Sequence, residues 1–289
     1  MLRRLLGLVG PIVPAPVRRG ALFYRSFGRL PPRKPVYFFE KVNWRITHDR
    51  RAKLLVGGDK LEMKRYAFER VPGINIARVL WSGDDINEVL DTAFPGEWVV
   101  KPIAGSGRYA FGQGSPRESG ITQSVLLGWR HRDLVRIAGE WIYSKGRPGF
   151  FIEERIPTDG LASLVEMKFF VFDDEVKLIL VDHVVDGESR RRFYTPDWQP
   201  FDVTHGGKPL DAVRPAPGRL SEMLEIVLNL GSGFDFVRID LFAAGESIWF
   251  GEISPYPASG LSAFSDLKFD HWLGSQWTLP STRGVLRGT

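Results

Sequence analysis

The chain has 289 residues, of which 43% are hydrophobic and 12% aromatic, so it can bury a full core and is long for one simple domain. It contains no cysteine, which excludes disulfides, zinc thiolate sites and a cysteine nucleophile, and is compatible with a reducing, cytoplasmic setting. No window approaches about 18 consecutive apolar residues, which argues against a membrane-spanning helix.

The net charge of +5 is unevenly distributed along the chain. Residues 1–39 carry eight basic groups and no acid, which leaves −3 for the remainder. Apolar residues and prolines interleave with these charges. The segment therefore allows three interpretations: an arm that contacts an anionic membrane surface, a poorly ordered leader, or a signal peptide with an unsuitable cleavage region. A nucleic-acid partner is not expected, because aromatic and basic residues do not alternate along a stripe.

In chain order, apolar periodicity and turn residues predict alternating helices and strands. A helix is expected over 59–71 with Asp59 as its N-cap, and another over 84–93. The segments that follow are a strand at 98–102, a glycine-rich stretch at 104–114, a helix at 130–143, a strand at 150–156, a hairpin pairing 167–172 with 176–182, a helix at 221–230, and a last hairpin pairing 234–242 with 248–255. Strands joined by short turns, with helices between them, indicate an α+β fold.

The last hairpin carries two carboxylates and a guanidinium. Asp240 and Glu252 lie on its two strands, and Arg238 precedes Asp240 by two residues. Because side chains alternate along a strand, Arg238 and Asp240 share one face. Two acids and an arginine on one sheet face suit Mg²⁺-bound phosphates.

Two earlier segments fit either nucleotide binding or ordinary surface structure. Lys101 ends an apolar strand and leads into a Gly-Ser-Gly sequence, which can surround a phosphate or form a simple turn. The strand ending in Glu153-Glu154 could meet an adenine edge through its backbone, with Ile156 on the base, or be an edge strand with solvated acids.

Glu166 and Lys168, two residues apart on a predicted strand, are similarly ambiguous. The pair could bind a ribose hydroxyl and a phosphate, or it could form a cross-strand salt bridge.

Taken in order, these segments resemble the nucleotide motifs of the ATP-grasp superfamily. The closer resemblance, from about residue 38 to residue 279, is to the TupA-like family of teichuronopeptide biosynthesis. It rests on residues 38–44, Asp59-Lys60, Val99-Val100-Lys101, residues 167–172, Asp197-Trp198, residues 236–240 and Phe250-Gly251-Glu252. The resemblance implies an ATP-grasp fold, with two α+β lobes whose antiparallel sheets hold ATP between them. Its expected divisions are a basic arm (1–39), a lid lobe with the glycine-rich loop (40–149), a C-terminal lobe with the magnesium site (150–280) and a tail (281–289).

The resemblance also implies roles by position. Residues expected to bind ATP are Lys60, Lys101, Gly105, Ser106, Gly107, Glu153, Glu154, Arg155, Ile156 and Glu166. Within this set, the lysines and the glycine loop would meet phosphates, Glu153 and the backbone at 155–156 would meet adenine, and Glu166 would meet ribose. Asp240 and Glu252 would coordinate Mg²⁺, with Ser254 at a third metal position where the superfamily often has Asn. Residues expected to act in catalysis are Arg238, which would stabilise the transferring phosphoryl group, Lys168 and Arg192.

Such a site would let a substrate carboxylate attack the γ-phosphate of ATP, after which an amine displaces phosphate. The expected function is therefore an ADP-forming carboxylate–amine ligase. By the family's association its substrates would be an amino acid and an acidic sugar, surface polysaccharide or polysaccharide precursor, with Arg192 gripping the acidic partner. A phosphotransferase, and a glycosyltransferase-like or non-catalytic role in polysaccharide assembly, are the alternatives. The expected location is the cytoplasm, with peripheral contact at the inner face of the membrane through the arm.

Overall fold

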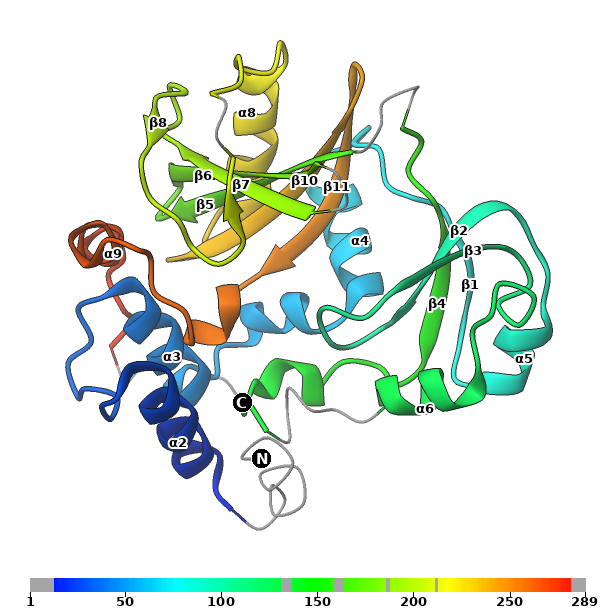
Figure 1. The fold of residues 1–289 in the computed structure, drawn as a ribbon, viewed down its shortest axis with the longest axis horizontal. Helices are drawn as coiled ribbons and strands as arrows, with labels where there is room; N and C mark the ends of the chain where they lie inside the picture. The colour runs from blue at the N-terminus through cyan, green and yellow to red at the C-terminus, as the bar shows by residue number, and fades with distance from the viewer. Residues whose placement is uncertain (1–12, 131–136, 159–163, 186–187, 211–212, 282–289) are drawn as a thin grey trace.

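Two antiparallel sheets of different size organise the protein. The computed structural model describes residues 13–130, 137–158, 164–185, 188–210 and 213–281. Figure 1 shows the larger sheet and the smaller sheet on either side of helix α4 (Lys60–Arg70). None of the helices described here is long and apolar enough to cross a membrane.

The larger sheet has the strand order β11-β10-β5-β6-β7-β8, with β9 paired in parallel to β7. Its strands are β5 (Val165–Phe172), β6 (Glu175–Val185), β7 (Glu188–Tyr194), β8 (Pro200–Phe201), β9 (Lys208–Pro209), β10 (Val237–Ala244) and β11 (Ser247–Ser254). The expected hairpin between β5 and β6 is confirmed. Its turn residues Asp173 and Asp174 both have positive φ, a conformation that Asp tolerates better than most residues.

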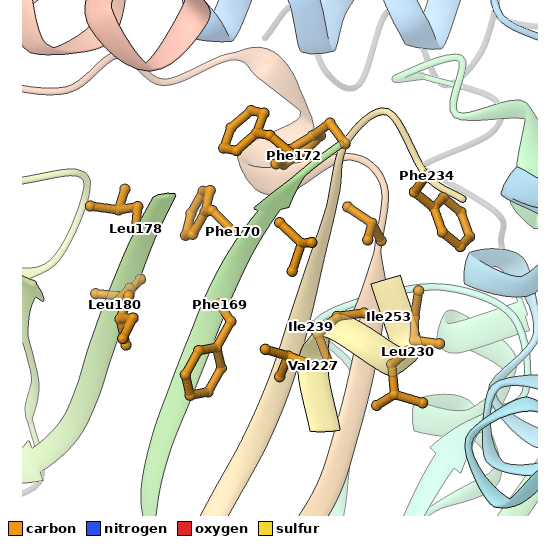
Figure 2. Packing of buried hydrophobic residues seen from close by; sticks show 14 of the residues in the cluster. Phe169, Phe170, Phe172, Leu178, Leu180, Val227, Leu230, Phe234, Ile239 and Ile253 are labelled. Carbon is orange, nitrogen blue, oxygen red and sulfur yellow. The ribbon is translucent and has the colours of Figure 1, made fainter. Parts of the chain in front are cut away.

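Helix α8 (Leu220–Gly231) covers one face of this sheet. Its buried residues recur at helical spacing, as an amphipathic helix requires: Met223, Ile226, Val227 and Leu230. Figure 2 shows Val227 and Leu230 beside Ile239 of β10 and Ile253 of β11. Each such side chain contributes roughly 1.5–3 kcal/mol on burial, so this layer stabilises the sheet that carries the acidic hairpin.

A second group of helices lies at one end of the larger sheet. The group consists of α2 (Ala15–Phe27), α3 (Phe38–His48), the 3₁₀ helices η1 (Ala52–Gly58) and η3 (Pro257–Gly260), and α9 (Leu267–Ser275). Residues of α3, η1 and α9 join the same core, whereas Leu22 of α2 belongs to a separate small cluster with Ala138. Behind α3 lies a buried ion network, in which Arg45 contacts Asp235 at 2.7 Å and Arg51 contacts both Asp49 and Asp235. This network ties α3 to the start of β10.

The smaller sheet has the order β1-β4-β2-β3 and a separate hydrophobic core around Trp98. Its strands are β1 (Val79–Gly83), β2 (Phe94–Pro102), β3 (Ala110–Gly114) and β4 (Phe150–Glu154). Helices α5 (Ile86–Asp91) and α6 (Gln123–Arg130) accompany it. The expected lobe boundary at residue 150 separates β4 from its sheet partners. Residues 40–58, which were assigned to the lid lobe, pack into the larger core instead.

Most predicted elements are confirmed, although β4 ends at Glu154 rather than at 156 and β10 begins at Val237 rather than at 234. Three further expectations differ from the structure. β2 begins at Phe94 rather than at 98. Part of the helix expected over 130–143 lies outside the described residues, and its end is the 3₁₀ helix η2 (Trp141–Ser144). The interpretation of the basic arm as a poorly ordered leader is wrong for residues 15–27, because α2 buries Leu22 and Phe23 against the body.

Candidate nucleotide-binding site

A cavity of about 620 Å³ lies between the two sheets. Its walls come from α4, the loop between β2 and β3, and strands of both sheets. The predicted site residues that line it are Lys60, Lys101, Ser106, Gly107, Glu153, Glu166, Lys168, Arg238, Asp240 and Glu252. Residues up to 192 positions apart in the chain thus meet in one space.

The carboxylate end of the cavity is the hairpin of β10 and β11. Asp240 and Glu252 are direct cross-strand neighbours. The Arg238 guanidinium donates to both oxygens of Asp240, at 2.7 and 2.6 Å, and lies 3.9 Å from Glu252. Burial alone would lower the pKa of Arg238, but Asp240 and Glu252 outweigh it and raise that pKa. The guanidinium therefore stays charged and is held in one orientation.

A β-bulge at Gly251 shifts the register of the two strands of this hairpin by one residue. The register passes from Asp240 opposite Glu252 to Leu241 opposite Phe250, which leaves Gly251 as the extra residue. A Cβ there would lie 2.8 Å from the carbonyl oxygen of Asp240, closer than any side chain fits. The Phe-Gly-Glu sequence thus needs its glycine in order to present Glu252 opposite Asp240.

Strand β5 places one ammonium group among three carboxylates. Lys168 is opposite Asp240 in the register, and its Nζ lies 2.5 Å from Glu166, 3.7 Å from Asp182 and 4.0 Å from Asp240. Burial and the nearby Asp240 raise the pKa of Glu166 in spite of Lys168. The contact with Glu166 runs along one strand, while those with Asp182 and Asp240 cross to β6 and β10, so the cross-strand salt bridge that was one of the expected alternatives is present.

Helix α4, which lies between the two sheets, supplies further lysine side chains to the cavity. Asp59 caps the helix by accepting hydrogen bonds from the backbone N–H groups of Leu61 and Glu62, as its sequence predicts. Lys60 follows the cap, and its Nζ donates to the carbonyl oxygen of Gly105 in the glycine-rich loop. Burial lowers the pKa of Lys60. The loop and the helix terminus therefore meet at the phosphate-binding end expected for the cavity.

Lys64 lines the cavity although it was not predicted. Its Nζ lies 2.6 Å from Glu153, whose other oxygen lies 2.5 Å from Lys101. Burial would raise the pKa of Glu153, but the two lysines outweigh it and lower that pKa. The signal for Lys64 was present in the sequence: it follows Lys60 by four residues and so shares its helix face.

Six predicted site residues are not among those lining the cavity: Gly105, Glu154, Arg155, Ile156, Arg192 and Ser254. Glu154 pairs with Arg78, and Arg155 with Glu97, both toward solvent. Ser254 is opposite Arg238 in the register, two positions beyond the Asp240–Glu252 pair.

The structure brings Arg191 to the cavity in place of Arg192. Arg191 is opposite Asp182 across β6 and β7, and its Nε donates to that carboxylate at 2.9 Å. Arg192 is opposite the buried Val181 and donates its Nε to the carbonyl oxygen of Leu210. Because side chains alternate along β7, only one of these neighbours can face the cavity.

Ser189, two residues before Arg191, completes a group that sequence reasoning missed. Its hydroxyl donates to Asp182 at 2.5 Å, so Asp182, Ser189 and Arg191 form a connected set at the cavity wall. The two-residue spacing of Ser189 and Arg191 was the available signal, but the sequence analysis predicted no strand over 188–194.

Asp240 and Glu252 are chemically suited to hold Mg²⁺. No three acidic or histidine side chains among the described residues cluster closely enough to form a metal site unaided. Mg²⁺ usually binds proteins through one or two carboxylates and completes its octahedron with phosphates and waters, so a pair is sufficient. Glu252 is 27% exposed, which leaves its oxygens accessible from the cavity.

The sequence matches the family described as TupA-like ATPgrasp over residues 40–278. The chain belongs to this family. Its fold is accordingly the ATP-grasp fold, and the cavity between the two sheets is its candidate ATP site. The residue roles inferred by position stay predictions.

Curated relatives match part of the chain. The formate-dependent phosphoribosylglycinamide formyltransferase of Bordetella avium (strain 197N) is 28% identical over 193 residues, which is 60% of this chain and 38% of the relative. The enzyme of that name from Pseudomonas fluorescens (strain Pf0-1) is 29% identical over 178 residues, 58% of this chain and 36% of the relative. The match thus spans less than two-fifths of either relative.

The solved structures to which the chain is similar are more distant in sequence. D-alanine–D-alanine ligase from Helicobacter pylori has a TM-score of 0.42 at 16% identity, over 78% of this chain and 60% of that one. N5-carboxyaminoimidazole synthetase from Staphylococcus aureus has a TM-score of 0.39 at 14% identity, over 78% and 53%.

Proposed function

We propose that this protein is an ATP-dependent, ADP-forming carboxylate–amine ligase that works through an acyl phosphate. The observation that carries this proposal is the arrangement of charge in the cavity. Lys60 and Lys101 line the same cavity as Arg238, Asp240 and Glu252 of the hairpin. Cations that share a cavity with a carboxylate pair are what the phosphates of Mg-ATP require.

Each of these groups has a role in this chemistry. Asp240 and Glu252 would hold Mg²⁺, which when bound neutralises charge on the phosphates. Lys60 and Lys101 bind phosphate oxygens. Arg238, held by Asp240, is positioned to meet charge that develops on the transferring phosphoryl group. Because the groups are preorganised in a part-buried cavity, little reorganisation is needed when that charge develops.

The cavity wall formed by β6 and β7 is suited to bind an anionic substrate. Arg191 uses Nε for Asp182 and Nη1 for the carbonyl oxygen of His205, at 3.4 Å, and no described residue accepts from its Nη2. Such a guanidinium can bind a carboxylate with one edge while its orientation is fixed. We propose an amino acid and an acidic sugar or polysaccharide precursor as the substrates. The formyltransferase relatives, whose name specifies formate, offer a second carboxylate to test.

ADP release tests the ligase proposal. The purified protein is screened with Mg-ATP, amino acids and formate against acidic sugars and oligosaccharides. An active pair should release ADP only when both a carboxylate and an amine are present. Asp240→Asn should lower this rate by about 100-fold or more, because it removes one charge from the metal pair. Asp202→Asn, in an exposed segment outside the cavity, is the matched control.

Product analysis separates the alternatives. Phosphate that remains on the product would instead identify a phosphotransferase. If the protein does not bind Mg-ATP, and Lys101→Ala binds Mg-ATP no differently from the unaltered protein, an ATP-dependent activity is contradicted. A non-catalytic role would then be favoured.

A further inference from the structure

Helix α2 is fixed to the body by a buried arginine. Figure 1 shows α2 at the edge of the molecule beside α3. Arg19 is fully buried and donates to Asn43 Oδ1 at 2.9 and 2.6 Å, to the carbonyl oxygen of Ser259 at 2.7 Å and to that of Ala138 at 3.2 Å. With a further hydrogen bond to Ser259 Oγ at 3.0 Å, five hydrogen bonds to three separate segments leave α2 little freedom to move away from the body.

The outer face of α2 is apolar and exposed. Val17, Ala21 and Tyr24 follow one another at spacings of four and three residues, so they share one side of the helix. Val17 is 60% exposed and Tyr24 58%. After the left-handed cap at Gly28 the chain turns back, and Leu30, 68% exposed, extends the same surface into a shallow groove of about 710 Å³.

Basic residues lie in this surface and directly after it in the chain: Arg25 lines the groove, and Arg33 and Lys34 follow Leu30. The described residues that line the groove include no acid. Arg25, Arg29, Arg33 and Lys34 are exposed. No acidic residue occurs between positions 13 and 39, and the first that follows, Glu40, is buried and paired with Arg29. The surface defined by α2 and residues 28–34 is therefore both apolar and positively charged.

We propose that this α2 surface docks on an anionic lipid bilayer. Helices that lie in the membrane interface have one apolar face bordered by basic side chains. The apolar side chains insert at the headgroup boundary, and the basic side chains pair with anionic lipids. The charge decides in favour of lipid over a second copy of the chain, since two such faces would repel one another. The proposal stands independently of the ligase activity.

Point variants test the surface without removing the helix. Deleting residues 1–39 is unsuitable, because it would also remove the core residues Arg19 and Phe23. The full-length chain is instead sedimented with vesicles of phosphatidylcholine and phosphatidylglycerol, and with phosphatidylcholine alone. Arg25→Glu/Arg33→Glu and Val17→Ser/Tyr24→Ser are compared with Arg65→Glu/Arg117→Glu, which changes the net charge equally at exposed arginines elsewhere.

The unaltered protein should bind the anionic vesicles, less so at high salt, and not phosphatidylcholine alone. The α2 charge reversal should lower the apparent partition coefficient by about tenfold or more, whereas the Arg65/Arg117 control should not. The thermal unfolding midpoint of each variant checks that it is folded. Equal binding of all variants, loss of binding only on deletion of residues 1–11, or self-association abolished by the α2 variants would each overturn the proposal.

Discussion

Two adjacent arginines on β7 show that the position of a residue along a strand decides whether its side chain faces the cavity. Arg191 lines the cavity and is oriented by Asp182, while Arg192 bonds to the backbone at Leu210 on the other side. The two have the same chemistry and differ only in which face of the strand they occupy.

Substituting each arginine in turn should therefore separate substrate binding from structure. Arg191→Ala should lower kcat/KM for the anionic substrate by about 10–100-fold, since a charge-assisted contact is lost, and should leave Mg-ATP affinity unchanged. Arg192→Ala should leave kcat/KM within about threefold. Steady-state kinetics with an active substrate pair, together with nucleotide titration, give both quantities. A larger effect from Arg192→Ala would contradict the placement of the substrate at β7.

At the scale of elements, helix α4 connects local capping to the site. Its N-cap Asp59 also accepts from Arg147, and the helix carries both Lys60 and Lys64 toward the cavity. The start of this helix thus sets where two cations lie.

Removing the cap should disturb both stability and nucleotide binding. Asp59→Ala should lower the free energy of unfolding by about 1–2 kcal/mol and raise the KM for ATP several-fold, because Lys60 loses its fixed backbone. Asp266→Ala removes the N-cap of α9, away from the cavity, and should cost similar stability without changing that KM. Urea unfolding and ATP-dependent kinetics measure the two effects. If both variants change the KM for ATP by the same factor, the Asp59 cap affects ATP binding only through the overall stability of the protein, and the prediction is contradicted.

For the whole molecule, Glu140 links segments that are far apart in the chain. It is buried, hydrogen-bonds with Ser259 of η3 and lies near Arg19 of α2. Burial raises its pKa to about 7, in spite of both partners. The folded protein therefore holds this proton at pH values where the unfolded chain has released it.

This shift predicts a pH-dependent stability. Because the folded-state pKa is raised, stability from Glu140 is fully present below its ordinary pKa and declines as pH rises to about 7, by up to about 3 kcal/mol in total. Glu140→Gln should remove this decline, and the exposed Glu225→Gln should retain it. Urea unfolding at about pH 5 and about pH 8 measures the difference. An unchanged slope in Glu140→Gln would assign the pH dependence to other groups, such as Asp270, whose pKa burial raises to about 6.

Local sequence determined the elements that depend on near neighbours. The Asp59 cap, the β5–β6 hairpin and the placement of Arg238 and Asp240 on one strand face follow from capping, turn chemistry and a period of two, which act over a few residues. These interactions do not require knowledge of the rest of the fold.

Only the tertiary structure decided the features that depend on pairing between residues far apart in the chain. It assigned β4 to the smaller sheet, faced Arg191 rather than Arg192 toward the cavity, and set Glu153 between Lys64 and Lys101. Strand order and register are fixed by contacts between residues far apart in the chain, and burial then selects which face of each strand is inside. A one-residue difference in register reverses that selection, so the sequence pattern predicted the chemistry of the site and the packing chose the residues that line it.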